Sequence, residues 1–128
     1  MDIDHQEAQA IAAKLQRWHD EARSLVDEAS DKSRLSPSSI NSLRSRLATL
    51  KHEIKESAKY ETLSGRKTAK TELEQYFFGP AVRSTSANFR LRTDTNPKSE
   101  LWARGLNEVK FELSYTLDGL QRFVAENP

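Results

Sequence analysis

The sequence contains no cysteine, and only four glycines and four prolines occur among its 128 residues. Without cysteine the chain forms neither disulfides nor thiolate metal sites. No apolar run approaches the ~20 residues that a membrane-spanning helix needs, and the acidic, polar start MDIDHQEAQ differs from a signal peptide. These absences predict a cytoplasmic protein that does not bind a membrane, and the scarcity of glycine and proline favours long helices.

Hydrophobic side chains recur at the three- and four-residue steps of amphipathic helices in the first half of the chain. The first stripe predicts a helix over about residues 4–30 and consists of Ala8, Ile11, Leu15, Trp18, Ala22, Leu25 and Ala29. Ser36 and Pro37 supply a cap and a suitable first residue for a second helix. Its stripe consists of Ile40, Leu43, Leu47, Leu50 and Ile54. We expect a stop or kink within residues 60–65.

The second half of the chain predicts a short helix and a long one. The short helix covers about residues 66–78 and ends at Gly79-Pro80, a pair that cannot continue it. Asn96-Pro97 repeats the cap-and-proline start, and the last helix runs to about Ala125. Its stripe consists of Trp102, Leu106, Val109, Leu113, Thr116, Leu120 and Phe123. The aperiodic stretch between the two helices, about residues 79–95, is predicted to be a long loop.

The predicted fold class is therefore all-α, an antiparallel up-down helical bundle. It contains three long helices, one short helix and the long loop at about 79–95. A chain of this length suits a single domain, so residues 1–128 are expected to form one bundle. The predicted core anchors are Leu15, Trp18, Leu47, Leu50, Trp102, Leu106, Leu113 and Leu120.

The last helix carries apolar residues on a second face. At about 100° per residue, Leu101, Phe111 and Tyr115 lie opposite the core stripe. Either these side chains bind another chain, which predicts a protein partner or a homo-oligomer, or the loop segment NFRLR covers them. Gly105 and Gly119 lie beside the core stripe and would let a neighbouring backbone approach closely. Tolerated surface glycines are an equally good interpretation.

Basic residues concentrate in the middle of the chain. Residues 37–99 carry twelve Lys/Arg against six Asp/Glu, whereas both ends are acidic. Such charge can bind phosphates while aromatic rings stack on unpaired bases, so this region is a possible nucleic-acid or acidic-partner site. Its members are Arg66, Lys67, Lys70, Arg83, Phe89, Arg90 and Arg92. Glu72, Glu74 and Asp94 dilute the charge, and the sequence pI of about 8.0 is modest for a nucleic-acid-binding domain.

Catalytic motifs are weakly represented. Arg46 and His52, with five residues between them, resemble the Arg–His pair of helical-bundle RNases of the HEPN class, which implies RNA cleavage. A chain of this composition contains roughly 0.8 such pairs by chance, and Leu47 stands where that family usually has a polar residue. The segment SGRKTAK lacks the contiguous Gly-Lys-Ser/Thr of a phosphate-binding loop, which argues against nucleotide hydrolysis.

The three histidines, His5, His19 and His52, lack the spacing of a metal-ligand set, so neither a metal nor another cofactor is expected. The sequence favours a non-catalytic protein-interaction or oligomerisation module, such as an adaptor, an inhibitor or an accessory domain. A nucleic-acid-binding bundle that uses residues 66–92 is the alternative, and a HEPN-like RNase is third.

Overall fold

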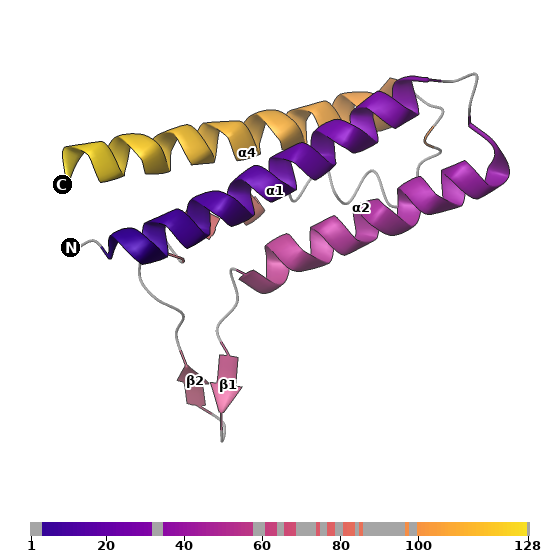
Figure 1. Cartoon of the computed structure of the whole chain (residues 1–128). Helices are drawn as coiled ribbons and strands as arrows, with labels where there is room; N and C mark the ends of the chain where they lie inside the picture. Colours follow the sequence, from indigo (N-terminus) through magenta and orange to yellow (C-terminus); the bar gives the residue numbers. More distant parts are fainter. Residues whose placement is uncertain are drawn as a thin grey trace.

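The computed structural model contains three long helices and a small hairpin (Figure 1). The helices are α1 (His5–Ser30), α2 (Pro37–Ser57) and α4 (Glu100–Glu126), and the strands are β1 (Glu61–Leu63) and β2 (Arg66–Thr68). Residues 74, 77–78, 81–83 and 85 also have helical backbone. The structure describes residues 4–31, 35–57, 61–63, 66–68, 74, 77–78, 81–83, 85, 97 and 100–127. The predicted fold class, three long helices with a shorter helical segment, is confirmed.

The first two helices begin at capping side chains, and the cap of α2 is the predicted Ser36. Asp4 is the N-cap of α1, and its carboxylate accepts hydrogen bonds from the backbone N–H groups of Gln6 at 3.0 Å and Glu7 at 3.3 Å. Before α2, the Ser36 hydroxyl accepts from the backbone N–H of Ser39 at 3.2 Å. These bonds satisfy N–H groups that have no partner inside the helix, which explains why each helix starts at that point.

Helix α1 lies antiparallel to both of the other long helices, so α2 and α4 run in the same direction (Figure 1). The α1–α4 contact is the more extensive of the two. The apolar stripes of all three helices join one cluster of buried side chains. All eight predicted core anchors belong to it, and none is more than 3 % exposed. The three- and four-residue periodicity therefore identified the inner face of each helix correctly.

The short helical segment contributes aromatic side chains to this core. The Phe78 ring lies 5.2 Å from the ring of Trp18 in α1, and the Phe77 ring lies 5.7 Å from that of Phe123 in α4. Phe77 and Phe78 are both buried. They fill space that the long helices alone leave open.

Residues 81–83 and Thr85, which were predicted to belong to the long loop, are helical, and the rest of the predicted loop lies outside the described residues. Ala81 and Thr85 are fully buried one helical turn apart, and the Thr85 hydroxyl donates to the Ala81 carbonyl at 2.6 Å. Proline is well tolerated in the first turn of a helix. The Gly79-Pro80 pair was predicted to end the short helix, and it is compatible with the helical backbone that directly follows it.

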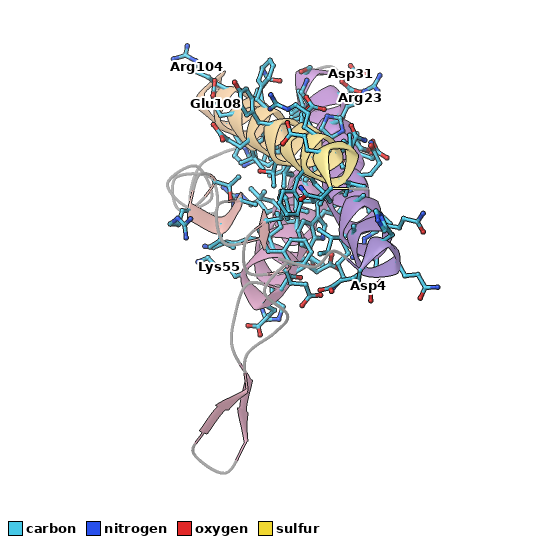
Figure 2. The ribbon with its side chains drawn as sticks, turned by 90° about the vertical axis from the view of Figure 1, so that its left-hand side faces the viewer. Asp4, Arg23, Asp31, Lys55, Arg104 and Glu108 are labelled. Carbon is cyan, nitrogen blue, oxygen red and sulfur yellow. The ribbon has the colours of Figure 1, made fainter. Side chains whose placement is uncertain are left out.

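The prediction of helix from Arg66 onward is wrong for the first three residues. Arg66 to Thr68 form β2, which pairs antiparallel with β1 in the register Glu61–Thr68 and Leu63–Arg66. Two residues, Ser64 and Gly65, separate the strands, the length and composition of a tight hairpin loop. The hairpin extends away from the long helices in both views (Figures 1 and 2).

The described part of α4 starts at Glu100, after the proline that was expected to begin the helix. Pro97 instead lies buried in a turn. Within α4 the core stripe includes Leu117, which is 9 % exposed, whereas Thr116 is half-buried. The Thr116 hydroxyl donates to the Glu112 carbonyl one turn earlier at 2.9 Å, which satisfies it without a partner in the core.

Candidate interaction surface on helix α4

The side of α4 that faces away from the bundle carries two exposed aromatic side chains. Phe111 is 56 % exposed and Tyr115 is 74 % exposed, and within the described ranges they are the large apolar side chains left in solvent. They follow one another by one helical turn, so they form one continuous patch. Leu101, the third member predicted for this face, lies in α4, but its side chain is outside the described part of the chain.

The aromatic pair is the centre of a longer row of side chains, which we call the outer stripe. Its steps of four and three residues give the repeat of a coiled-coil seam. The outer stripe consists of Arg104, Glu108, Phe111, Tyr115, Asp118 and Arg122, all exposed. Counting outward from the aromatic pair in either direction, the next residue carries a carboxylate and the one after it carries a guanidinium. Figure 2 shows Arg104 and Glu108 projecting from α4 away from the rest of the bundle.

The middle and the C-terminal end of the outer stripe differ in shape. At Phe111 the Nζ of Lys110 lies 5.4 Å from the ring centroid, a cation–π contact within the helix. Toward the C-terminus the surface is hollowed, and the described lining residues are Tyr115, Asp118, Gln121, Arg122 and Ala125. A Cβ atom added at Gly119 would have nothing within 4 Å. The stripe thus offers a ring at its middle and an open hollow beyond it.

The predicted basic site is only partly described by the structure. Arg83 is exposed, and Arg66 and Lys67 lie on β2, where their side chains are not described. The remaining members, Lys70, Phe89, Arg90 and Arg92, lie outside the described residues, as does the NFRLR segment expected to cover Phe111 and Tyr115.

Arg46, half of the HEPN-like pair, is bound by carboxylates of α1. Its Nε donates to Glu21 at 2.9 Å, its Nη1 donates to Glu28, and its Nη2 donates to the Ser24 hydroxyl at 3.2 Å. The hydrogen bond to Glu21 raises the pKa of Arg46, and the charges of both carboxylates act in the same direction. His52 is exposed and lies about 120° further around α2. The helix therefore directs the two side chains to different sides.

A second cross-helix polar contact lies further along the same interface. One oxygen of the Glu53 carboxylate accepts hydrogen bonds from Arg17 and from the Trp18 indole N–H, each at 3.1 Å. The Trp18 ring is buried, so Glu53 satisfies the one polar atom that this ring brings into the core. Sequence periodicity did not reveal these pairs, since it carries no information about which residues of different helices meet.

A hollow also lies where α1 and α2 meet near their connection. Arg46, the basic residue in the described part of its lining, is already bound to Glu21 and Glu28. Its described lining consists of Asp27, Glu28, Asp31, Leu35, Ser38, Ser39, Ser42, Leu43 and Arg46. Among the residues that the structure describes, no three His, Asp or Glu side chains are grouped closely enough to hold a metal ion.

Comparison of the chain with protein-family models, curated proteins and solved structures gives no significant match in any of the three. In the described part of the chain, no helix combines the length and the apolar character needed to cross a bilayer.

Proposed function

We propose that this protein is a non-catalytic helical-bundle module that acts by binding another macromolecule through the outer stripe of α4. The observation that carries the proposal is the exposure of Phe111 and Tyr115 on adjacent turns, at 56 % and 74 %. Single exposed apolar residues are ordinary on protein surfaces, but a contiguous aromatic patch with a charged border is typical of interaction sites.

Burial of these two rings against a partner would supply a large part of the binding free energy. Tyr and Phe bring large contact areas and few rotatable bonds, so little conformational entropy is lost when they are fixed. The charged residues at either end, such as Glu108 and Asp118, would form the polar rim that orients the partner. Accessory, adaptor, inhibitor and oligomerisation domains all work in this way.

Site-specific photo-crosslinking in cells tests this function. Phe111 is replaced by a photoreactive benzoyl-phenylalanine, and the control carries the same group at Ala48, an exposed position on α2. We expect protein adducts from position 111, of either the same chain or another one, and few from position 48. Equal labelling from both positions, or no adduct from position 111, would contradict the proposal.

The crosslinking experiment, together with an RNA-binding measurement, also tests the alternative of nucleic-acid binding. Arg83 is exposed, and β2 carries Arg66 and Lys67 on the extended hairpin, which favours a basic contact away from α4. An Arg66→Ala/Lys67→Ala variant would then lose single-stranded RNA binding that weakens steeply with salt, while adducts from position 111 would be absent. RNA cleavage that disappears in His52→Ala would instead support the HEPN-like RNase.

A further inference from the structure

The outer stripe of α4 carries two exposed rings, and its C-terminal part borders a hollow. Four residues of the hollow, Asp118, Gln121, Arg122 and Ala125, follow the pattern i, i+3, i+4, i+7. In coiled coils these four positions form the hole that receives one side chain from the facing helix. Phe111 is an exposed aromatic residue on the same stripe, and it lies three helical turns before the centre of that hole.

Resting on the proposed interaction function, we propose that the partner at this face is a second copy of the chain. The two α4 helices lie antiparallel, and each Phe111 enters the hollow of the other copy. A two-fold axis at the level of residues 116–117 fills both hollows at once, so the assembly closes as a dimer. A parallel arrangement fills one hollow and leaves the other open.

Charge and hydrogen bonding favour the same register. Phe111 lies opposite the partner's Arg122, whose guanidinium can contact the ring face as a cation–π pair. Tyr115 lies opposite the partner's Asp118, so its hydroxyl can donate to that carboxylate. By symmetry each contact occurs twice. Lys110 already lies near one side of the Phe111 ring, and the exposed part of the ring remains for the partner.

The competing antiparallel register places the two aromatic pairs directly on each other. In that register the stripe sets Glu108 opposite the partner's Asp118 and Arg104 opposite the partner's Arg122. Each of these two like-charged contacts occurs twice in the symmetric dimer, and the resulting repulsion disfavours the arrangement. The shifted register avoids them, because residue 104 lies beyond the end of the partner helix and Glu108 faces the partner's Ala125.

Gly119 gives the two helices room to approach. It lies beside the stripe, and a Cβ there would contact nothing within 4 Å, so packing inside the chain does not require a glycine. Glycine inside a helix is less favourable than alanine. In the proposed dimer Gly119 lies beside the partner's Tyr115, where a bare backbone accommodates the ring.

The contact is small, since four residues of each stripe, from Phe111 to Arg122, face one another. Such an interface falls below the ~1,200 Å² of stable complexes, so we expect a transient dimer with a Kd in roughly the micromolar range or weaker. Detection therefore requires protein concentrations of about 10–500 μM.

Distances between spin labels test the register. The chain has no cysteine, so Arg104→Cys and Glu126→Cys each introduce a single labelling site. Along the helix axis the proposed register separates the two copies of residue 104 by about 38 Å and the two copies of residue 126 by about 28 Å. The competing register reverses this order, because it separates the two copies of residue 104 by about 27 Å and those of residue 126 by about 39 Å. A parallel pair brings both distances below about 20 Å. Either of these two outcomes overturns the proposal.

Charge reversal at two equivalent positions provides a second measurement by sedimentation equilibrium. Arg122→Glu should weaken the dimer at least about tenfold, because it removes two cation–π contacts and places carboxylates against the rings. Arg104→Glu makes the same charge change outside the contact and should alter the Kd less than about twofold. A larger effect from residue 104 contradicts the register.

A protein that stays monomeric at every concentration overturns the second copy as partner. If position 111 still crosslinks to another macromolecule in cells, the interaction function stands with a different partner. If both measurements are negative, both proposals fail.

Discussion

Helix α1 has two neighbours that are held by different chemistry. Its contact with α4 is extensive and joins two apolar stripes. Its smaller contact with α2 is bordered by charge, because Arg46 donates to two carboxylates of α1 and Glu53 accepts from Arg17 and Trp18. Apolar burial is strong but non-directional, whereas ion pairs at a protein surface are weak but directional. The first interface should therefore supply more stability, and the second should fix how α2 is rotated and aligned.

The largest expected effect tests the apolar interface. Leu113→Ala in α4 and Leu47→Ala in α2 both remove fully buried side chains. Each should lower the free energy of unfolding by about 2–5 kcal/mol, with Leu113→Ala at the upper end, since its more extensively packed surroundings collapse less readily around a cavity. Urea unfolding followed by circular dichroism measures both. A larger loss from Leu47→Ala would reverse the ranking of the two interfaces.

A smaller effect is expected at the charged border of the α1–α2 interface. Arg46→Met removes the ion pairs and keeps most of the aliphatic stem. The Arg46 side chain is 31 % exposed, and the side chains of Glu21 and Glu28 are 37 % and 54 % exposed. Water can therefore solvate the carboxylates that remain in the variant. We expect a loss of about 1 kcal/mol at low salt that shrinks as salt is added.

Arg23→Met is the matched control for Arg46→Met, because Arg23 lies on an exposed part of α1 and the charge change is identical. Figure 2 shows Arg23 at the outer edge of the bundle. Equal destabilisation by the two variants would mean that net charge, and not the cross-helix pairs, is what matters.

The smallest effect concerns Asp20, on the exposed surface of α1. A hydrogen bond from Gln16 and a second contact with His19 hold the pKa of Asp20 below its ordinary value of 3.8. A carboxyl group with a lowered pKa in the folded state adds stability above its unfolded pKa, and that stability is lost as the pH falls through the folded pKa. Asp20→Asn should be slightly less stable at pH 6, and the difference should vanish once the pH lies below the folded-state pKa of Asp20.

Unfolding titrations of Asp20→Asn and Gln16→Ala at pH 6 and at a series of lower pH values check this dependence. Gln16→Ala removes the main cause of the lowered pKa and should reproduce most of the pH 6 difference. A deficit in Asp20→Asn that persists unchanged in acid would show that the carboxylate charge is not its origin.

Helix positions and inner faces could be predicted from the sequence because their causes are local. Asp4 and Ser36 cap helices through bonds to residues two or three positions away. Periodicity also placed Phe111 and Tyr115 opposite the core, and both are exposed. Neither inference needs knowledge of any other element, since a helix fixes the relative direction of its own side chains.

Predictions were wrong or incomplete where a residue's conformation or contacts depend on pairing with another element. Arg66 to Thr68 were assigned to a helix, but they pair with a strand five residues upstream. Arg46 was considered for catalysis, although its partner Glu21 is 25 residues away in the chain and occurs on a different helix. Pairing between elements is a property of the packed chain, and a single sequence contains no direct record of it.

The sequence by itself determined the three long helices, the start of α2 at Ser36 and Pro37 and the division of α4 into a buried and an exposed face, because 3.6-residue geometry and capping act over one or two turns. Only the tertiary structure decided that α1 contacts α4 more extensively than α2 and that Phe78 packs against Trp18. It also decided that Arg46 and Glu53 of α2 pair with Glu21 and Arg17 of α1. These features depend on which surfaces meet, and that choice is made by the whole core as it packs.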